Sequence, residues 1–197
     1  MGARDGRVAF HAGASRRCAI FVVDIKDFTV EERDDPVQLG LRRSLYGLLA
    51  RSFNAAGIPW RLCVREDRGD GALIVLPVPV PVSALVPSLV TRLGDALHGH
   101  NRSVLPLHTI RLRAALHFGT VHRDSYGVAG RAVNQAFRLV DSTAIRDALD
   151  SSTADLALIL SEEAYRELSP AGAPLLFRPV TAEAKKSTMP AWLWPGA

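Results

Sequence analysis

The sequence has few cysteines, no long apolar run and no dense block of one charge, and each shortage excludes a class of protein. Its 197 residues contain only two cysteines, Cys18 and Cys63, and both fall in apolar, strand-like runs. Two cysteines do not make a disulfide framework, so we expect buried free thiols. The fold must then depend on an apolar core, which 48% hydrophobic content in a chain of this length can supply.

Membrane and export signals are also lacking. The apolar run most easily mistaken for a membrane span, residues 73–82, is too short to cross a bilayer and is broken by prolines. The first 17 residues are basic and rich in glycine and alanine, without the apolar stretch of a signal peptide. We therefore expect a flexible segment at residues 1–17, a single domain at residues 18–197, a cytoplasmic location and no membrane partner.

Positive charge is slightly in excess but is not concentrated. The 24 Lys and Arg residues exceed the 20 Asp and Glu residues by four, and they are spread along the chain. A nucleic-acid-binding arm normally shows a dense Lys/Arg block, so we expect no nucleic-acid partner. A mildly basic surface suits anionic small molecules equally well. A nucleic-acid-binding domain stays an alternative on fold analogy alone, and it would require salt-sensitive binding.

The hydrophobic pattern predicts strands and helices in alternation. Continuous apolar runs indicate buried strands, and apolar residues recurring three and four positions apart indicate helices. By these criteria strands are expected at residues 18–24, 60–65, 72–76, 110–118, 156–160 and 191–194. Helices are expected at residues 36–56, 83–98 and 131–149, followed by a short helix with Ser161 as its N-cap.

Prolines and glycines mark the expected connections. Four prolines between residues 77 and 87 indicate a stiff connector, and the glycines of residues 119–130 indicate a loop. The resulting order of elements predicts an α+β fold, with a ferredoxin-like split βαβ core and an extra C-terminal helix and strands.

Two aspartates have the surroundings of a metal site. Asp24 follows an apolar run and begins a turn, and Asp70 lies between Gly69 and Gly71 before another apolar run. Carboxylates at the ends of two neighbouring strands repel each other, and a divalent cation removes that repulsion. The pair is therefore a candidate site for magnesium and a phosphate substrate.

Two further candidates share one side of the helix expected from residue 131. Asn134 and Arg138 are four residues apart, so both side chains project in the same direction. An amide can orient a sugar while a guanidinium one turn away stabilises charge on a phosphate. A simple pair of surface side chains is the alternative interpretation, because Asn and Arg at this spacing are common.

Four motifs occur together and in a fixed order. They are Asp24-Ile25-x-x-Phe28-Thr29, Arg68-Gly69-Asp70-Gly71, Arg113-x-x-Leu116-His117-x-Gly119-x-Val121 and Gly130-x-Ala132-Val133-Asn134-x-Ala136-x-Arg138-Leu139. The ordered set resembles the class III nucleotidyl cyclase homology domain, the catalytic domain of adenylyl and guanylyl cyclases. The resemblance covers residues 18–194, and it is strongest to the compact cyclase-like proteins of actinobacteria.

The resemblance implies a metal and phosphate half of a site. Asp24 and Asp70 match the aspartates that hold two Mg²⁺ or Mn²⁺ ions, one of which activates the ribose 3′-hydroxyl while the other holds the triphosphate. Ile25, Phe28 and Thr29 lie in the turn whose backbone amides meet the phosphates.

The resemblance also implies a second half. Asn134 matches the residue that orients the ribose, and Arg138 matches the one that stabilises the α-phosphate as pyrophosphate leaves. Lys185 is the best match to the phosphate-binding lysine, with Lys186 next. In the family the two halves come from different subunits, so the resemblance implies a homodimer with a nucleoside triphosphate at each interface site.

The positions that read the base depart from the family pattern. Glu66 occupies the first position and could accept hydrogen bonds from guanine, which mildly favours GTP, with a pyrimidine or a relaxed specificity as the alternatives. The second position is Gly127, which has no side chain to offer a base. Asp27 replaces the usual glycine of the phosphate turn and is expected either to weaken triphosphate binding or to cap the next segment. The leading hypothesis is a cyclase that makes a 3′,5′-cyclic nucleotide, and the alternative is a catalytically degenerate dimeric module that binds or senses nucleotide.

Overall fold

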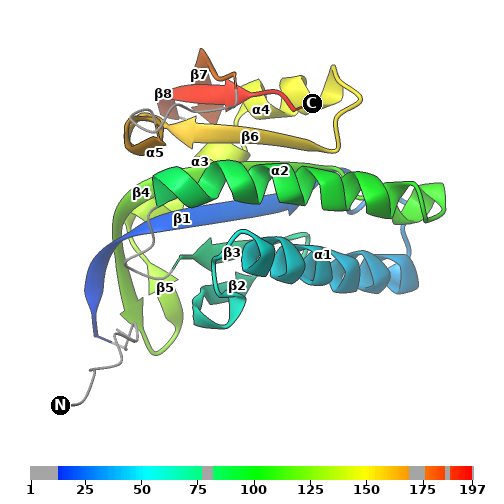
Figure 1. Cartoon of the computed structure of the whole chain (residues 1–197), viewed down its shortest axis with the longest axis horizontal. Coiled ribbons are helices and arrows are strands. Elements are labelled where there is room, and N and C mark those ends of the chain that lie inside the picture. Colours follow the sequence, from blue (N-terminus) through cyan, green and yellow to red (C-terminus); the bar gives the residue numbers. More distant parts are fainter. Residues whose placement is uncertain (1–12, 77–81, 169–175, 185–186, 197) are drawn as a thin grey trace.

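One mixed sheet with helices on both faces forms the protein (Figure 1). The structure is a computed structural model and describes residues 13–76, 82–168, 176–184 and 187–196. The strands are β1 (Ser15–Ile25), β2 (Val64–Asp67), β3 (Gly71–Val75), β4 (Leu112–Asp124), β5 (Gly127–Ala129), β6 (Leu156–Ser161), β7 (Arg178–Ala184) and β8 (Ser187–Trp194). The helices are α1 (Asp35–Ala55), α2 (Val82–Asn101), α3 (Arg131–Val140), α4 (Thr143–Asp150) and α5 (Glu162–Leu168), and short 3₁₀ turns occur at Trp60–Leu62 and Pro106–His108.

The sheet has the order β2-β3-β1-β4-β6-β8-β7, and β5 extends the edge of β4. Residues of α1, α2 and α5 pack in the apolar core on one face, and residues of α3 and α4 pack in the core on the other. Because both faces of β1 are covered, residues 18–23 are all buried, which explains the uninterrupted apolar run in the sequence. The α+β fold expected from the sequence is confirmed.

Local signals place α1 where the pattern predicts it. The Oδ1 atom of Asp34 accepts a hydrogen bond from the Val37 amide at 3.1 Å, which caps the first turn, and Pro36 occupies a position where no amide is needed. Helix α1 ends at Ala55, before Gly57, whose φ is +78°. Asp34, and not Asp27, therefore caps this helix.

The prediction of a stiff connector up to residue 87 is wrong for residues 82–87, which are helical. Residues 77–81 lie outside the described residues, and α2 begins at Val82 and runs through Pro87. A proline there removes one intrahelical hydrogen bond. Leu89, Leu93 and Leu97 are fully buried on one side of α2, and this burial outweighs the lost bond.

The loop expected at residues 119–130 is also wrong. Strand β4 continues to Asp124 because it pairs with β1 as far as Ser15, and it then turns back into β5. Gly119 lies within β4, where a Cβ atom would come within 2.4 Å of the Ala132 Cβ on α3. The glycine thus permits close packing of α3 on the sheet, and here it does not mark a loop.

Two further boundaries differ from the prediction, and one strand was missed. The strand expected at residues 60–65 starts with a 3₁₀ turn, in which Trp60 packs edge-on against Phe53, and strand pairing begins at Val64. The single helix expected at residues 131–149 is two helices, α3 and α4, separated around the buried Ser142. Strand β7 was not predicted.

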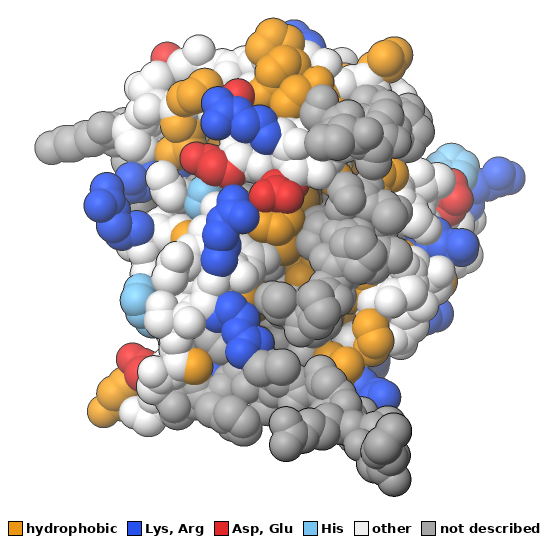
Figure 2. All heavy atoms as spheres, turned by 60° about the vertical axis from the view of Figure 1, so that its left-hand side comes forward, with side chains coloured by type: hydrophobic (Ala, Val, Ile, Leu, Met, Phe, Trp, Pro, Cys, Tyr) orange, Lys and Arg blue, Asp and Glu red, His pale blue; other side chains and the backbone are white. Residues whose placement is uncertain are grey.

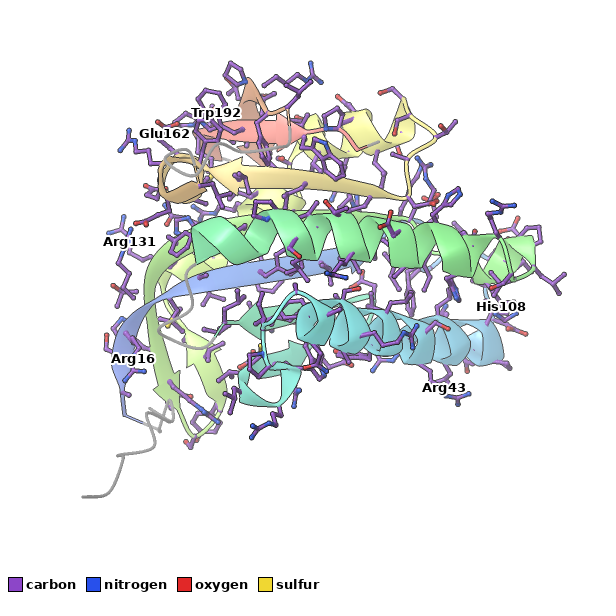
Figure 3. All side chains as sticks on the ribbon, viewed as in Figure 1. Arg16, Arg43, His108, Arg131, Glu162 and Trp192 are labelled. Atoms are coloured by element: carbon purple, nitrogen blue, oxygen red, sulfur yellow. The ribbon has the colours of Figure 1, made fainter. Side chains whose placement is uncertain are left out.

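Helix α5 is fixed by the side chains that the sequence marks. The Ser161 Oγ atom accepts a hydrogen bond from the Ala164 amide at 3.2 Å, which confirms the expected N-cap. Trp192 donates its indole N–H to Glu162 at 2.8 Å and stacks on Tyr165 with ring centroids 3.7 Å apart (Figure 3). These contacts attach α5 to β8.

Charges of both signs cover the face that carries α5. Figure 2 shows Lys and Arg side chains interleaved with Asp and Glu side chains there, and the described side chains form no continuous basic strip on that face. Ion pairs account for part of this pattern, between Arg17 and Glu167 at 3.2 Å and between Arg166 and Glu162 at 3.1 Å.

The cysteines and the helices can be compared with what the sequence predicts of disulfides and membrane spans. Cys18 and Cys63 are both buried free thiols, as predicted, and burial raises the pKa of the Cys63 thiol to about 12. Among the described residues, none of the helices has the length and apolar character needed to cross a bilayer.

Candidate functional site

Asp24 and Asp70 come together at one end of the sheet. Asp24 lies near the end of β1, opposite Gly71 of β3 and Arg113 of β4, and the Ile25 amide donates to the Asp70 carbonyl at 2.9 Å. The two carboxyl groups are within hydrogen-bonding reach of each other. Burial, and to a smaller extent the neighbouring Asp70, raise the pKa of Asp24 to about 6, although Arg113 opposes the shift. The ends of two strands therefore hold two carboxylates in an unfavourable contact.

Arg113 is the cation that the protein itself provides at this pair. Its guanidinium forms an ion pair with the Asp24 carboxylate, while its buried Nε atom has no hydrogen-bond partner among the described residues. The sequence contains a signal for this residue, because Arg113 opens the third of the ordered motifs. Its register opposite Asp24 becomes visible only in the fold.

The donor set fits a hard divalent cation. Magnesium prefers oxygen ligands and is commonly held by one or two carboxylates together with water and substrate phosphates. Within the described ranges, no group of three or more His, Cys, Asp or Glu side chains could hold a metal ion. Among the described residues, the two carboxylates are thus not joined by a third side chain of these four types, which is the arrangement expected when water and a substrate supply further ligands.

The turn after β1 contains one residue with left-handed backbone geometry, a feature found in anion-binding nests. Asp27 has φ of +56°, the left-handed region that non-glycine residues rarely adopt. The amides of Ile25 and Lys26 donate to the carbonyls of Asp70 and Arg111, both at 2.9 Å. In the described part of the chain, the amides of Asp27, Phe28 and Thr29 donate to no group.

Arg33 fixes this turn and was missed by the sequence reasoning. It is buried, with 9% of its surface exposed, and its guanidinium donates to the carbonyls of Lys26 at 3.2 Å, Asp27 at 3.1 Å and Thr109 at 2.9 Å. Two of these carbonyls belong to the turn, so Arg33 links the turn to the segment that contains Thr109.

The side chain of Asp27 is mostly exposed. It lies 3.6 Å from the Lys26 ammonium, and Lys26 also pairs with Asp150 at 2.5 Å. These two contacts place a lysine between two acids beside the turn. Lys26 thereby offsets the negative charge that Asp27 brings to this turn.

Helix α3 presents Asn134 and Arg138 away from the sheet. Its buried side is formed by Ala132, Val133, Ala136, Leu139 and Val140. Asn134 and Arg138 are exposed, and their side chains make no hydrogen bond or ion pair with any residue that the structure describes. Neither side chain is therefore engaged by the described part of the chain.

Glu66 and Gly127, the two positions expected to meet the base, are in contact. The Glu66 Oε1 atom accepts a hydrogen bond from the Val128 amide at 2.5 Å. A Cβ atom at Gly127 would lie 2.2 Å from that oxygen, and Gly127 has φ of +133°. The glycine thus makes room for the Glu66 carboxylate.

Arg68 links this carboxylate to α3. Its Nη2 atom donates to Glu66 Oε2 at 2.5 Å, and its guanidinium lies over the ring of Phe137, 5.0 Å from the centroid. Phe137 is three residues from Asn134, so both occur on the same side of α3. Nothing in the sequence alone indicates the stacking of Arg68 on Phe137.

Two further candidates from the sequence are Lys185 and Asp67. Lys185 lies outside the described residues. The Asp67 carboxylate already has hydrogen-bond partners within the chain. Arg42 donates to it at 2.9 and 2.6 Å, and the Tyr46 hydroxyl donates to it at 3.0 Å. These bonds connect the turn of Asp70 to α1 and leave Asp67 a structural role.

Replacing Gly127 with alanine is expected to destabilise the fold by about 1–3 kcal/mol, because the new methyl group meets Glu66 and the backbone is strained. Thermal or urea unfolding measures the change. Gly99→Ala in α2 is the matched control, since its Cβ would have open space, and it is expected to leave stability unchanged or slightly raised. Equal stability of wild type and Gly127→Ala would contradict the contact.

The fold has counterparts among nucleotidyl cyclases, although the sequence matches no protein-family model and no curated protein. The guanylyl cyclase Cya2 is 21% identical with a TM-score of 0.66, and the match covers 93% of each chain. The guanylate cyclase domain of RhGC from Catenaria anguillulae, in complex with GTP, is 19% identical with a TM-score of 0.63, over 91% of this chain and 97% of that one.

A third similar structure is the adenylate/guanylate cyclase/hydrolase from Silicibacter pomeroyi, at 19% identity and a TM-score of 0.64, over 92% of this chain and 97% of that one. The chain has the fold of the class III adenylyl and guanylyl cyclase catalytic domain. The resemblance noted in the sequence motifs is thus confirmed at the level of the fold.

Proposed function

We propose that this protein is a metal-dependent nucleotidyl cyclase that converts a nucleoside triphosphate, preferentially GTP, into a 3′,5′-cyclic nucleotide and pyrophosphate. The observation that carries the proposal is the contact between the Asp24 and Asp70 carboxyls, with the pKa of Asp24 raised to about 6. A divalent cation stabilises two neighbouring carboxylates by removing their repulsion. The fold, which is that of cyclase catalytic domains, is the second support.

The chain's residues divide into two groups in this proposal. Asp24 and Asp70 hold two Mg²⁺ or Mn²⁺ ions, and the amides of Asp27, Phe28 and Thr29 hold phosphate oxygens. The bound ions supply activation of the ribose 3′-hydroxyl and charge neutralisation at the triphosphate. Asn134 orients the ribose, and Arg138 stabilises the negative charge that develops on the α-phosphate.

A homodimer completes the site in this proposal. Asn134 and Arg138 are exposed and have no partner among the described residues, as side chains that act on a second subunit's substrate require. A head-to-tail pair then makes two sites, each with aspartates from one subunit and α3 from the other. Lys185 is proposed as a further phosphate contact.

A nucleotide-sensing module is the second candidate, and the Arg113–Asp24 ion pair favours it. A guanidinium already neutralises part of the carboxylate charge, which lowers the demand for a cation. In this case the dimer binds triphosphate without cyclising it.

The experiment that separates the two candidates combines a product assay with thermal unfolding. Each of the four ribonucleoside triphosphates is incubated with the protein and Mn²⁺, and cyclic products are detected by mass. A cyclic product supports the cyclase. A higher unfolding temperature with triphosphate and Mn²⁺, but no cyclic product, supports the sensor. Neither effect with any triphosphate contradicts both.

A further inference from the structure

We propose that Arg68 is a specificity-determining residue that recognises the 6-oxo oxygen of guanine and takes the place of the side chain that Gly127 lacks. The inference rests on the proposed function, because it concerns the base of the same nucleotide. It is carried by the contacts of Arg68 with Glu66 and Phe137.

The Arg68 guanidinium is held in a defined plane. Glu66 accepts one of its five N–H bonds at 2.5 Å, and the Phe137 ring covers one of its faces at 5.0 Å. The described residues accept no other N–H of Arg68, and its side chain is 39% exposed. A planar donor group fixed at two points and open to solvent is suited to recognising an oxygen acceptor.

Glu66 supplies the complementary acceptor. Each of its oxygens already accepts one hydrogen bond, from Val128 and from Arg68, and each keeps a second lone pair. The pair Arg68–Glu66 therefore presents donors beside acceptors. Guanine offers the matching edge, a 6-oxo acceptor followed by the N1–H and 2-amino donors.

Other bases satisfy fewer of these groups. Adenine carries an amino donor where guanine has the oxo group, so its amino group faces the Arg68 donors and no second donor reaches Glu66. An unmatched polar group in such a site costs affinity. Arg68 stacks on Phe137, and Phe137 lies one helical turn from Asn134, the proposed ribose contact. The proposed base contact and the proposed ribose contact are therefore linked through α3.

The test measures dissociation constants in the presence of Mn²⁺ by calorimetry, with 3′-deoxy triphosphates that lack the attacking hydroxyl. The bases are guanine, hypoxanthine, 2,6-diaminopurine and adenine. Hypoxanthine keeps the 6-oxo group without the 2-amino group, and 2,6-diaminopurine has the reverse. We expect Arg68→Leu to weaken binding of the two 6-oxo bases about tenfold and to change binding of the two 6-amino bases far less.

Arg65→Leu is the matched control. Arg65 adjoins Glu66 on β2 and also lies over an aromatic ring, that of Trp60 at 4.9 Å, but strand alternation directs it to the other face. We expect this variant to bind all four bases as wild type does. A uniform loss across the four bases in Arg68→Leu, or no loss, overturns the assignment of Arg68 while leaving the proposed function standing. If wild type binds none of the triphosphates, the proposed function itself fails.

Discussion

Asp24→Asn and Arg138→Ala are each expected to lower the rate of cyclic-nucleotide formation at least about a thousandfold. Asp24→Asn removes one of the two carboxylates proposed to hold the metal ions, so only the Asp70 carboxylate remains to bind them. Arg138→Ala removes a positive charge that acts on the transition state and hardly on the bound substrate. The loss is therefore expected in kcat for Arg138→Ala, with little change in KM.

Two matched variants show whether the losses are specific. Asp67→Asn changes an acid in the same turn as Asp70 that is bonded to Arg42, and Arg131→Ala changes an exposed arginine on the same helix as Arg138 (Figure 3). Both are expected to retain activity within about threefold of wild type. Retention of more than a tenth of wild-type activity by Asp24→Asn or Arg138→Ala would count against the roles assigned to these residues.

Co-expression of the two inactive variants is expected to restore about a quarter of wild-type activity. If the aspartates and α3 of one site come from different subunits, a mixed dimer has one doubly damaged site and one intact site. Random pairing makes about half of the dimers mixed, and each has one of two sites working, which gives about a quarter. Cyclic-product formation by the purified mixed sample is the measurement.

The control for this restoration is a pair of variants in the same half of the site. Asp24→Asn co-expressed with Asp70→Asn leaves every site with one damaged aspartate, so no activity is expected. Restoration by this second pair, or none by the first, would show that the site is not shared between subunits.

The parts of the candidate site that are local in sequence can be predicted from it. Asp24 and Asp70 each adjoin an apolar run, and apolar runs become the central strands β1 and β3, so their meeting follows from strand pairing. Asn134 and Arg138 are predictable for a similar reason, because helical spacing alone places them on one side of α3.

The parts that depend on packing between distant segments cannot be predicted in this way. Arg33 reaches a carbonyl 76 positions away, and Arg68 stacks on a ring of α3, and no periodic pattern encodes either contact. Gly119 misleads for the same reason. A glycine suggests a loop when its neighbours in sequence are considered, whereas here it accommodates Ala132 of another element.

Strand β7 could not be predicted from the sequence for a different reason. Its residues are mostly exposed, with Ala182 and Ala184 the buried members, and it begins with Arg178 and Pro179. An edge strand with small buried side chains has little hydrophobic alternation to detect, and proline is tolerated at its start.

Mass detection of cyclic nucleotides, after wild-type protein is incubated with Mn²⁺ and each of the four ribonucleoside triphosphates, tests the central claim most directly. The account predicts a 3′,5′-cyclic nucleotide and an equal amount of pyrophosphate, formed fastest from GTP and abolished by Asp24→Asn. The absence of any cyclic product from all four triphosphates, with the protein folded and dimeric, would contradict it.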